Sequence, residues 1–247
     1  MKRNRYDQKN SEPAPKDSHQ KLVQMAKAGV VTAQLSLGKM YAEGIDVSRN
    51  YSKAIKYYTL AAKQGHAEAQ SALGMMRYEG TGFRQNHTIA ADLFTLAAEQ
   101  GHAHAQFLLG WMYNDGMGVL KSNKTAIKWY TLAANQGHAK AQHTLGWMYE
   151  KGLGVAQDHW TAAKWYRLAA RQGDADSQVI LGGMYAMGKG IIQHKIYAYM
   201  WADLATANGN RNASKLREFV GQKMTSADIS KAQNLAQEYM RSGYNGC

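Results

Sequence analysis

Small and apolar residues recur along the chain at spacings of three and four. Between positions 102 and 115 they would occupy one face of a helix. These residues are Ala103, Ala105, Leu108, Leu109 and Met112. Gly116 follows, and glycine commonly ends a helix by adopting a left-handed backbone conformation. The pattern therefore predicts a helix from about His102 to Asp115.

A second helix is predicted after a short loop, beginning at Ser122. The equivalent positions elsewhere in the chain are Asn50, Asn86, Asp158 and His194. Four of these five are preferred N-cap residues, because a short side-chain oxygen accepts a hydrogen bond from a free N–H of the first turn. Gly137 ends this second helix. The two segments together predict a helical hairpin.

The hairpin is a repeat of 36 residues. Glycines stand at positions 29, 65, 101, 137, 173 and 209, and a second series stands at positions 44, 80, 116, 152 and 188. A Leu-Gly pair recurs inside each first helix, at positions 37, 73, 109, 145 and 181. Because glycine within a helix costs about 1 kcal/mol, we expect the backbone of a neighbouring helix to approach closely there. The sequence predicts five repeats over residues 29–209.

Both ends of the repeat array carry helical patterns. Residues 18–28 match the second helix of a unit and predict an N-terminal capping helix, preceded by a disordered basic tail over residues 1–17. Beyond residue 209 the repeat decays, and residues 225–228 resemble a capping box before another apolar helical face. We expect capping helices over 210–243, and a single domain over 18–243, because solenoids need covered ends.

The motif at Ala103–Val119, Ala-x-Ala-Gln-x-x-Leu-Gly-x-Met-Tyr-x-x-Gly-x-Gly-Val, and its continuation to Gly137 resemble the Sel1-like repeat (SLR). This family is related to the tetratricopeptide repeats. The resemblance implies an all-α fold, a right-handed α-α superhelical solenoid of helical-hairpin repeats. It also implies an adaptor or scaffold, commonly bacterial, that binds another protein and has no chemistry of its own.

The large aromatic residues fall into two groups. Tyr57, Trp129, Trp165 and Trp201 recur at one position of the second helix, which predicts packing in the core between units. Trp111 and Trp147 stand where the other units have Lys39, Met75 and Gly183, so the repeat does not require an aromatic residue there.

In tetratricopeptide-like stacks, first-helix residues outside the core line the concave face. We call the corresponding residues here the first-helix stripe and predict that they bind a partner. They are Leu35, Lys39, Ser71, Met75, Tyr78, Phe107, Trp111, Asn114, His143, Trp147, Glu150 and Val179. Phe107 and Trp111 are four residues apart, as are His143 and Trp147, so each pair projects from one side of its helix. These aromatic side chains either bind a ligand or fill the curved interior, and the sequence leaves both alternatives open.

Catalytic and metal-binding motifs are not found in the sequence. His66, His102 and His138 each follow a repeat glycine, and the next equivalents are Asp174 and Asn210, which indicates an N-cap position. No His-Glu-x-x-His motif, nucleophile elbow or phosphate-binding loop occurs. We therefore predict no catalytic residue, no metal site and no cofactor. An active site assembled from scattered residues remains a less favoured alternative.

Composition adds limits on location and partners. The chain of 247 residues has no apolar run near the roughly 18 residues that a membrane span needs. Its single cysteine, Cys247, excludes a disulfide framework. No signal peptide is visible, so we expect a cytoplasmic protein, or a periplasmic or secreted one if a leader was removed.

The net charge of +12 is unevenly distributed: residues 1–63 carry +7, residues 64–120 carry −3 and residues 121–247 carry +8. The favoured function is a monomeric scaffold that binds a protein or peptide segment on its concave face. The alternative is a solenoid that binds nucleic acid or another anionic surface through its basic ends. Because the stripe's aromatic residues Tyr78, Phe107 and Trp111 lie in the acidic middle, the sequence disfavours nucleic acid as the partner.

Overall fold

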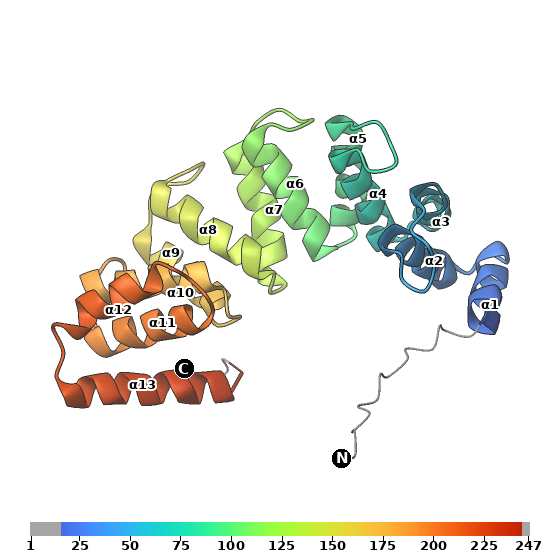
Figure 1. Cartoon of the computed structure of the whole chain (residues 1–247). Coiled ribbons are helices and arrows are strands. Elements are labelled where there is room, and N and C mark those ends of the chain that lie inside the picture. The colour runs from blue at the N-terminus through green and yellow to red at the C-terminus, as the bar shows by residue number, and fades with distance from the viewer. Residues whose placement is uncertain (1–15, 244–247) are drawn as a thin grey trace, which may run out of the picture. The chain divides into compact units, whose positions relative to one another are not determined.

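The structure, a computed structural model, describes residues 16–243 (Figure 1). Within this range it contains thirteen helices and no strand. They are α1 (Lys16–Lys27), α2 (Val31–Glu43), α3 (Tyr51–Lys63), α4 (Ala67–Glu79), α5 (His87–Glu99), α6 (Ala103–Asp115), α7 (Asn123–Asn135), α8 (Ala139–Lys151), α9 (His159–Ala170), α10 (Ala175–Met187), α11 (Lys195–Ala207), α12 (Ala213–Gly221) and α13 (Ser226–Arg241). The prediction of an all-α chain built from five helical hairpins is confirmed.

The chain divides into two compact units, residues 1–97 and 98–247. The first unit contains α1 to α4 and most of α5, and the second contains α6 to α13. The single domain predicted over residues 18–243 stays a prediction. Helix α1 begins at Lys16, two residues before the predicted start. The remainder of the predicted disordered tail, residues 1–15, lies outside the described residues.

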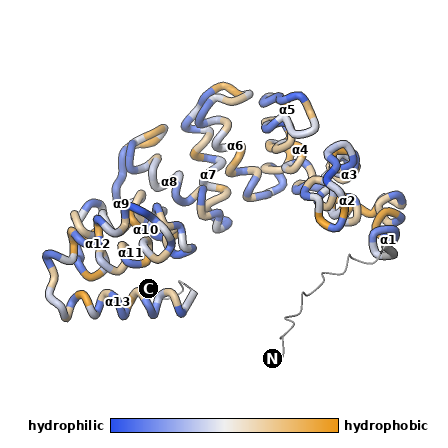
Figure 2. Tube along the Cα trace, in the orientation of Figure 1, coloured by the Kyte–Doolittle hydropathy of each residue, from blue (hydrophilic) through white to orange (hydrophobic). Residues whose placement is uncertain are grey.

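Hydrophobic and hydrophilic positions alternate along the helices (Figure 2). Their ends follow the predicted capping scheme. Side-chain atoms of Asn50, Ser122 and Asp158 accept hydrogen bonds from backbone N–H groups of α3, α7 and α9. Gly116 ends α6 in the left-handed region with φ of 76°, which glycine adopts without steric cost.

The glycine of each Leu-Gly pair faces an aromatic ring rather than a helix backbone in the first four hairpins. A Cβ atom on Gly110 would lie 2.8 Å from the ring of Tyr130, and one on Gly146 would lie 2.7 Å from the ring of Tyr166. The predicted close approach of backbone occurs only in the last hairpin, where a Cβ on Gly182 would meet the Ala198 carbonyl at 3.1 Å. In the other four, the glycine makes room for a large side chain of the same hairpin.

The predicted core role of Trp129 is corrected by this packing. Trp129 is half-buried, whereas the adjacent Tyr130 is only 1% exposed. Tyr130 lies four residues from both Ala126 and Ala134, which are buried on the same helical face. Tyr57 and Trp165 are half-buried in the same way, and only Trp201 is fully buried as predicted.

A ladder of buried amides, which we call the glutamine ladder, joins successive hairpins. Its members Gln34, Gln70, Gln106, Gln142 and Gln178 are all buried. Gln106 donates from Nε2 to the carbonyl of Ala98, at the end of the preceding hairpin, over 3.0 Å. Its Oε1 accepts from Nε2 of Gln136, at the end of its own hairpin, over 2.7 Å. The buried amide of Gln106 is thereby hydrogen-bonded through both its nitrogen and its oxygen, which avoids the cost of burying an unpaired polar group.

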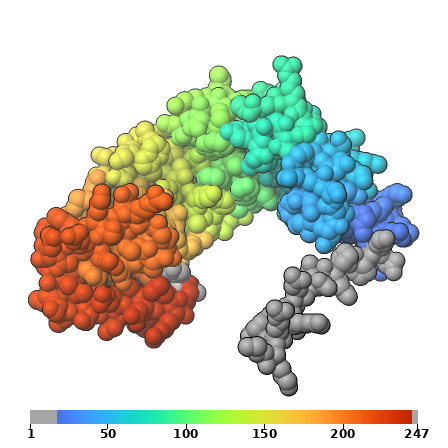
Figure 3. Space-filling model, viewed as in Figure 1, coloured from blue at the N-terminus to red at the C-terminus, as the bar shows by residue number. Residues whose placement is uncertain are grey.

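The end of the second unit is covered by α12 and α13, which both contact α11 (Figure 3). Tyr239 of α13 packs edge-on against Trp201 of α11, with ring centroids 5.3 Å apart. Of the predicted capping box, the N-cap bond is present, since Oγ1 of Thr225 accepts from the N–H of Asp228. The Asp228 carboxylate accepts from the Thr225 hydroxyl rather than from the Thr225 backbone N–H. Over residues 16–243, no helix is both long and apolar enough to span a bilayer.

Candidate functional site

The structure buries two members of the first-helix stripe. Leu35 on α2 and Ser71 on α4 retain 9% and 5% of their exposed surface and belong to the packed interior. They are therefore removed from the contact surface that the sequence predicted. Every other member is at least partly accessible.

The remaining stripe residues of the first unit make local contacts. Lys39 forms an ion pair with Glu68, and each side chain retains a little under half of its exposed surface. The Tyr78 ring stacks on His87 at a centroid distance of 5.1 Å. An ion pair exposed in this way contributes little to stability, so Lys39 remains accessible to a partner.

In the second unit, Phe107 of α6 packs across the junction with the next hairpin. Its ring stacks on that of His138 at 4.7 Å and tilts against Tyr130 at 5.7 Å. Trp111 lies one turn further along α6 and packs partly against the apolar cluster formed by α7 and α8. For Phe107, filling of the interior is therefore the better interpretation.

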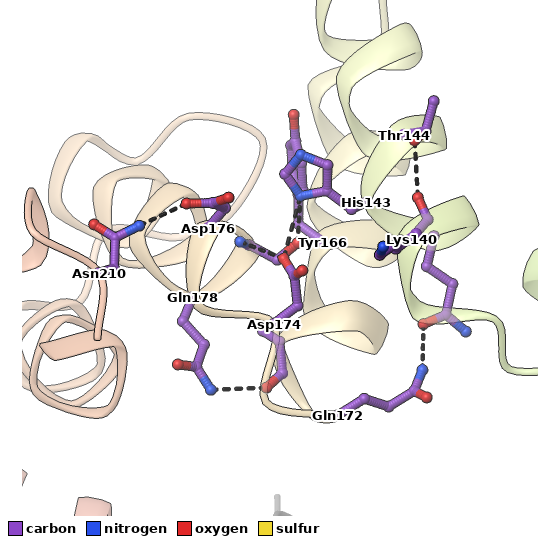
Figure 4. A network of polar contacts seen from close by, with 12 residues as sticks. Lys140, His143, Thr144, Tyr166, Gln172, Asp174, Asp176, Gln178 and Asn210 are labelled. Carbon is purple, nitrogen blue, oxygen red and sulfur yellow. Dashed lines mark hydrogen bonds and ion pairs between the residues drawn. The ribbon is translucent and has the colours of Figure 1, made fainter. Parts of the chain in front are cut away.

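His143 of α8 also joins two hairpins. Its Nδ1 lies 2.8 Å from Oγ of Ser177 and 3.3 Å from Oδ1 of Asp174 (Figure 4). Burial raises the pKa of Asp174, but hydrogen bonds from His143 and Ser177 outweigh it and hold that pKa at about 2. Asp174 also accepts from the Ser177 N–H and so caps α10. His143 is thus held in place by the neighbouring hairpin.

Trp147 is the most exposed large apolar residue of the stripe, retaining 40% of its surface. One turn away, Glu150 accepts from the Tyr166 hydroxyl over 3.0 Å and pairs with Lys151 and Lys189, each at 3.4 Å. Burial raises the pKa of Glu150, but the hydrogen bond from Tyr166 and the two ammonium groups bring it below its ordinary value. Glu150 is therefore part of an ionic network.

The N-cap prediction for the histidines holds at two of three positions. His102 and His138 accept hydrogen bonds from backbone N–H groups of α6 and α8, whereas His66 makes no side-chain cap bond. His138 also stacks on His104, with Nδ1 of His104 and Nε2 of His138 3.3 Å apart. Within residues 16–243, no three potential ligands among histidine, cysteine and the acidic residues gather closely enough to hold a metal ion.

A cavity that the sequence analysis missed opens beside α9 and α11, with a volume of about 720 Å³. Trp160, Arg167 and Tyr197 contribute to its lining. The signal was present in the sequence, because no other unit carries an aromatic residue at the positions of Trp160 and Tyr197 or an arginine at that of Arg167.

Comparison with known proteins identifies the family. The Sel1 repeat model matches residues 31–66, 67–102, 103–138, 139–174 and 175–210. No curated protein matches the chain. Among solved structures, a Sel1 repeat protein from Oxalobacter formigenes is 29% identical, with a TM-score of 0.74 over 90% of this chain and 98% of that one.

A second similar structure is a protective antigen of uropathogenic Escherichia coli strains that displays an SLR fold. It is 30% identical, with a TM-score of 0.58 over 91% of this chain and 56% of that one. The five matched segments cover most of the sequence and coincide with the five helical hairpins. The chain therefore belongs to the Sel1 repeat family and has its helical solenoid fold.

Proposed function

We propose that this protein is a non-enzymatic scaffold that binds a segment of a partner protein through the exposed part of the first-helix stripe in residues 98–243. Sel1 repeat proteins generally mediate protein–protein interaction. The observation that carries the proposal is Trp147, a tryptophan with 40% of its surface exposed at a position where the repeat accepts Lys39, Met75 or Gly183. Tryptophan is enriched among the residues that dominate binding energy in interfaces.

The surroundings of Trp147 support the same proposal. Glu150 is held by Tyr166, Lys151 and Lys189, and His143 is held by Asp174 and Ser177, so the polar groups near Trp147 are already positioned. A fixed surface loses less conformational entropy when a partner binds. Trp111 of α6 is partly accessible and extends this surface toward the preceding hairpin.

Site-specific photo-crosslinking in the source cell tests the proposal. A photoreactive phenylalanine at position 147 should capture a protein. The same group at Leu132, an exposed residue of a second helix, should not. With that partner purified, Trp147→Ala should weaken binding by about 2 kcal/mol, roughly 30-fold, as at a hot spot. Its melting temperature should change by only a few degrees.

Three results would count against this function. Equal capture from positions 147 and 132 would show that the stripe has no preference for a partner. Capture of RNA or DNA alone, abolished by nuclease, would favour the nucleic-acid alternative. A loss of stability in Trp147→Ala as large as that in Tyr130→Ala would show that Trp147 fills the core.

A further inference from the structure

The cavity of about 720 Å³ beside α9 and α11 continues into two smaller ones. Arg167 lines all three, and the smaller cavities have volumes of about 220 and 280 Å³. Together they form a groove, which we call the second-helix groove, along α9, the loop before α11, α11 itself and α13. It lies on different helices from the stripe residues Trp111 and Trp147.

The other hairpins show which residues the repeat itself requires at the positions that line this groove. Trp160 occupies a position held by Ser52, Thr88 and Lys124 in the preceding hairpins. Arg167 replaces a threonine that occurs in three hairpins, as Thr59, Thr95 and Thr131. Hairpins therefore pack without an aromatic residue at the first position and without a cation at the second, so the fold alone does not account for Trp160 and Arg167.

The groove is basic and its cations are not neutralised. Arg167, Arg171 and Lys164 line it, and none of its lining residues is acidic. Arg167 donates from Nη2 to the Tyr185 hydroxyl over 3.0 Å, but neither arginine has an ion pair with any residue in 16–243. Nε of Arg171 is buried and has no hydrogen-bond acceptor in the same range. A buried donor without an acceptor costs free energy, which a bound anion would recover.

The mouth of the groove is apolar and exposed. Trp160 retains 65% of its surface and Ile192, in the loop before α11, retains 88%. Large apolar side chains exposed beside a cavity are typical of interaction sites. The groove thus combines an apolar surface with guanidinium groups, whose planar donors match a carboxylate in a bidentate geometry.

We propose that the second-helix groove binds an acidic peptide segment of another protein. An aspartate or glutamate side chain in that segment pairs with Arg167 and Arg171, and a neighbouring aromatic or aliphatic side chain packs against Trp160 and Ile192. Charge complementarity supports this occupant, since residues 121–247 carry a net charge of +8. This site does not depend on the stripe, so the two proposals succeed or fail separately.

Selection from a random peptide library on the full-length protein tests the proposal. The probes are nonapeptides with acetylated and amidated ends, so that only side-chain carboxylates are available. Three variants restore residues that other hairpins carry at the same positions: Trp160→Thr, Arg167→Thr and Arg171→Asn, after Thr88, Thr131 and Asn135. Lys124→Thr, one hairpin earlier at the position of Trp160, is the matched control.

Selected peptides should contain an acidic residue close to an aromatic or aliphatic one. Their Kd should rise at least tenfold in Trp160→Thr, Arg167→Thr and Arg171→Asn and less than twofold in Lys124→Thr and Trp147→Ala. Melting curves should show that the variants remain folded. Because the pairing is ionic, affinity should also fall as salt is added.

The proposal would be overturned by the absence of enriched peptides, or by enriched peptides without acidic residues. Equal binding to wild type and Arg167→Thr would overturn it as well. So would tighter binding of single-stranded oligonucleotides than of any selected peptide, which would assign the groove to nucleic acid.

Discussion

At the residue scale, the pairing of one glycine with one aromatic ring organises each of the first four hairpins. Gly38, Gly74, Gly110 and Gly146 face Tyr58, Phe94, Tyr130 and Tyr166. The glycine costs about 1 kcal/mol of helix propensity, and the ring that it admits buries far more apolar surface than a methyl group would. The two residues are therefore best understood as one packing unit.

This packing unit predicts unequal effects for two adjacent aromatic residues. Tyr130→Ala should lower the free energy of unfolding by about 3–5 kcal/mol, the range for buried large aromatic residues, because it leaves a cavity over Gly110. Trp129→Ala should cost about 1 kcal/mol, since Trp129 is only half-buried. Urea denaturation followed by circular dichroism measures both.

Gly110→Ala gives an independent check, because its new methyl group meets the Tyr130 ring and should destabilise the protein by about 1–3 kcal/mol. If Trp129→Ala proved as costly as Tyr130→Ala, the assignment of Tyr130 as the core residue would be wrong.

At the scale of the helix, His138 makes contacts with two helices, α8 and α6. It caps α8 through Nδ1, and its ring stacks on Phe107 and His104 of α6. Burial lowers the pKa of both His104 and His138 below 6.5, and the proximity of each charged ring to other cationic groups lowers it further. The contact between the two hairpins therefore favours both rings in the neutral form.

A pH dependence of stability follows. Between pH 6.5 and the lowered pKa values, the unfolded chain binds protons that the folded chain does not, so stability falls as the pH decreases through this window. Above the window the contribution of the two histidines is fully present. The slope should be smaller in the double variant His104→Asn/His138→Asn, in which the asparagine introduced at the second position can still cap α8. Urea denaturation at several pH values between about 8 and 5 measures the slope.

Lys140→Ala should also reduce the slope, because Lys140 is one of the cationic groups that lower the pKa of both histidines. An unchanged slope in the double histidine variant would assign the pH dependence to other groups.

The helices could be predicted from the sequence because glycines, caps and apolar positions repeat in register. The sequence also contains a signal for the burial of Tyr130, because Tyr130 is spaced four residues from both Ala126 and Ala134. Since Trp129 and Tyr130 are adjacent, the pattern of aromatic residues alone does not show which of the two lies on the buried face of the helix. The glutamine ladder was missed because a polar side chain suggests a surface position, although its recurrence every 36 residues was visible. The contacts of His143 with the next hairpin depend on how successive hairpins stack. The residue pattern within a single helix carries no information about that stacking.

At the scale of the whole molecule, α13 closes the second unit. Ala232, Ala236 and Tyr239 are buried, and Tyr239 covers Trp201 of α11. A chain ending at residue 224 should expose this apolar face, because the last unit of a repeat array has no following unit to cover it. It should bind a hydrophobic dye more strongly and sediment as aggregates, whereas full-length protein should not.

Deletion of residues 1–15 is the matched control, since it removes charge and leaves the described helices intact. A truncated chain that stayed monodisperse, with unchanged dye binding, would show that α13 is dispensable.

The glutamine ladder has a consequence for how such a chain changes length. Gln106 and Gln142 each donate to the last turn of the hairpin before and accept from the end of their own hairpin, over the same two distances. An in-frame duplication of 36 codons inside the array would therefore supply one donor and one acceptor together, and no amide would be left unpaired. A gene of this kind can gain or lose whole units in one recombination event, whereas an insertion within a helix that is not a whole number of repeats shifts the hydrogen-bond register.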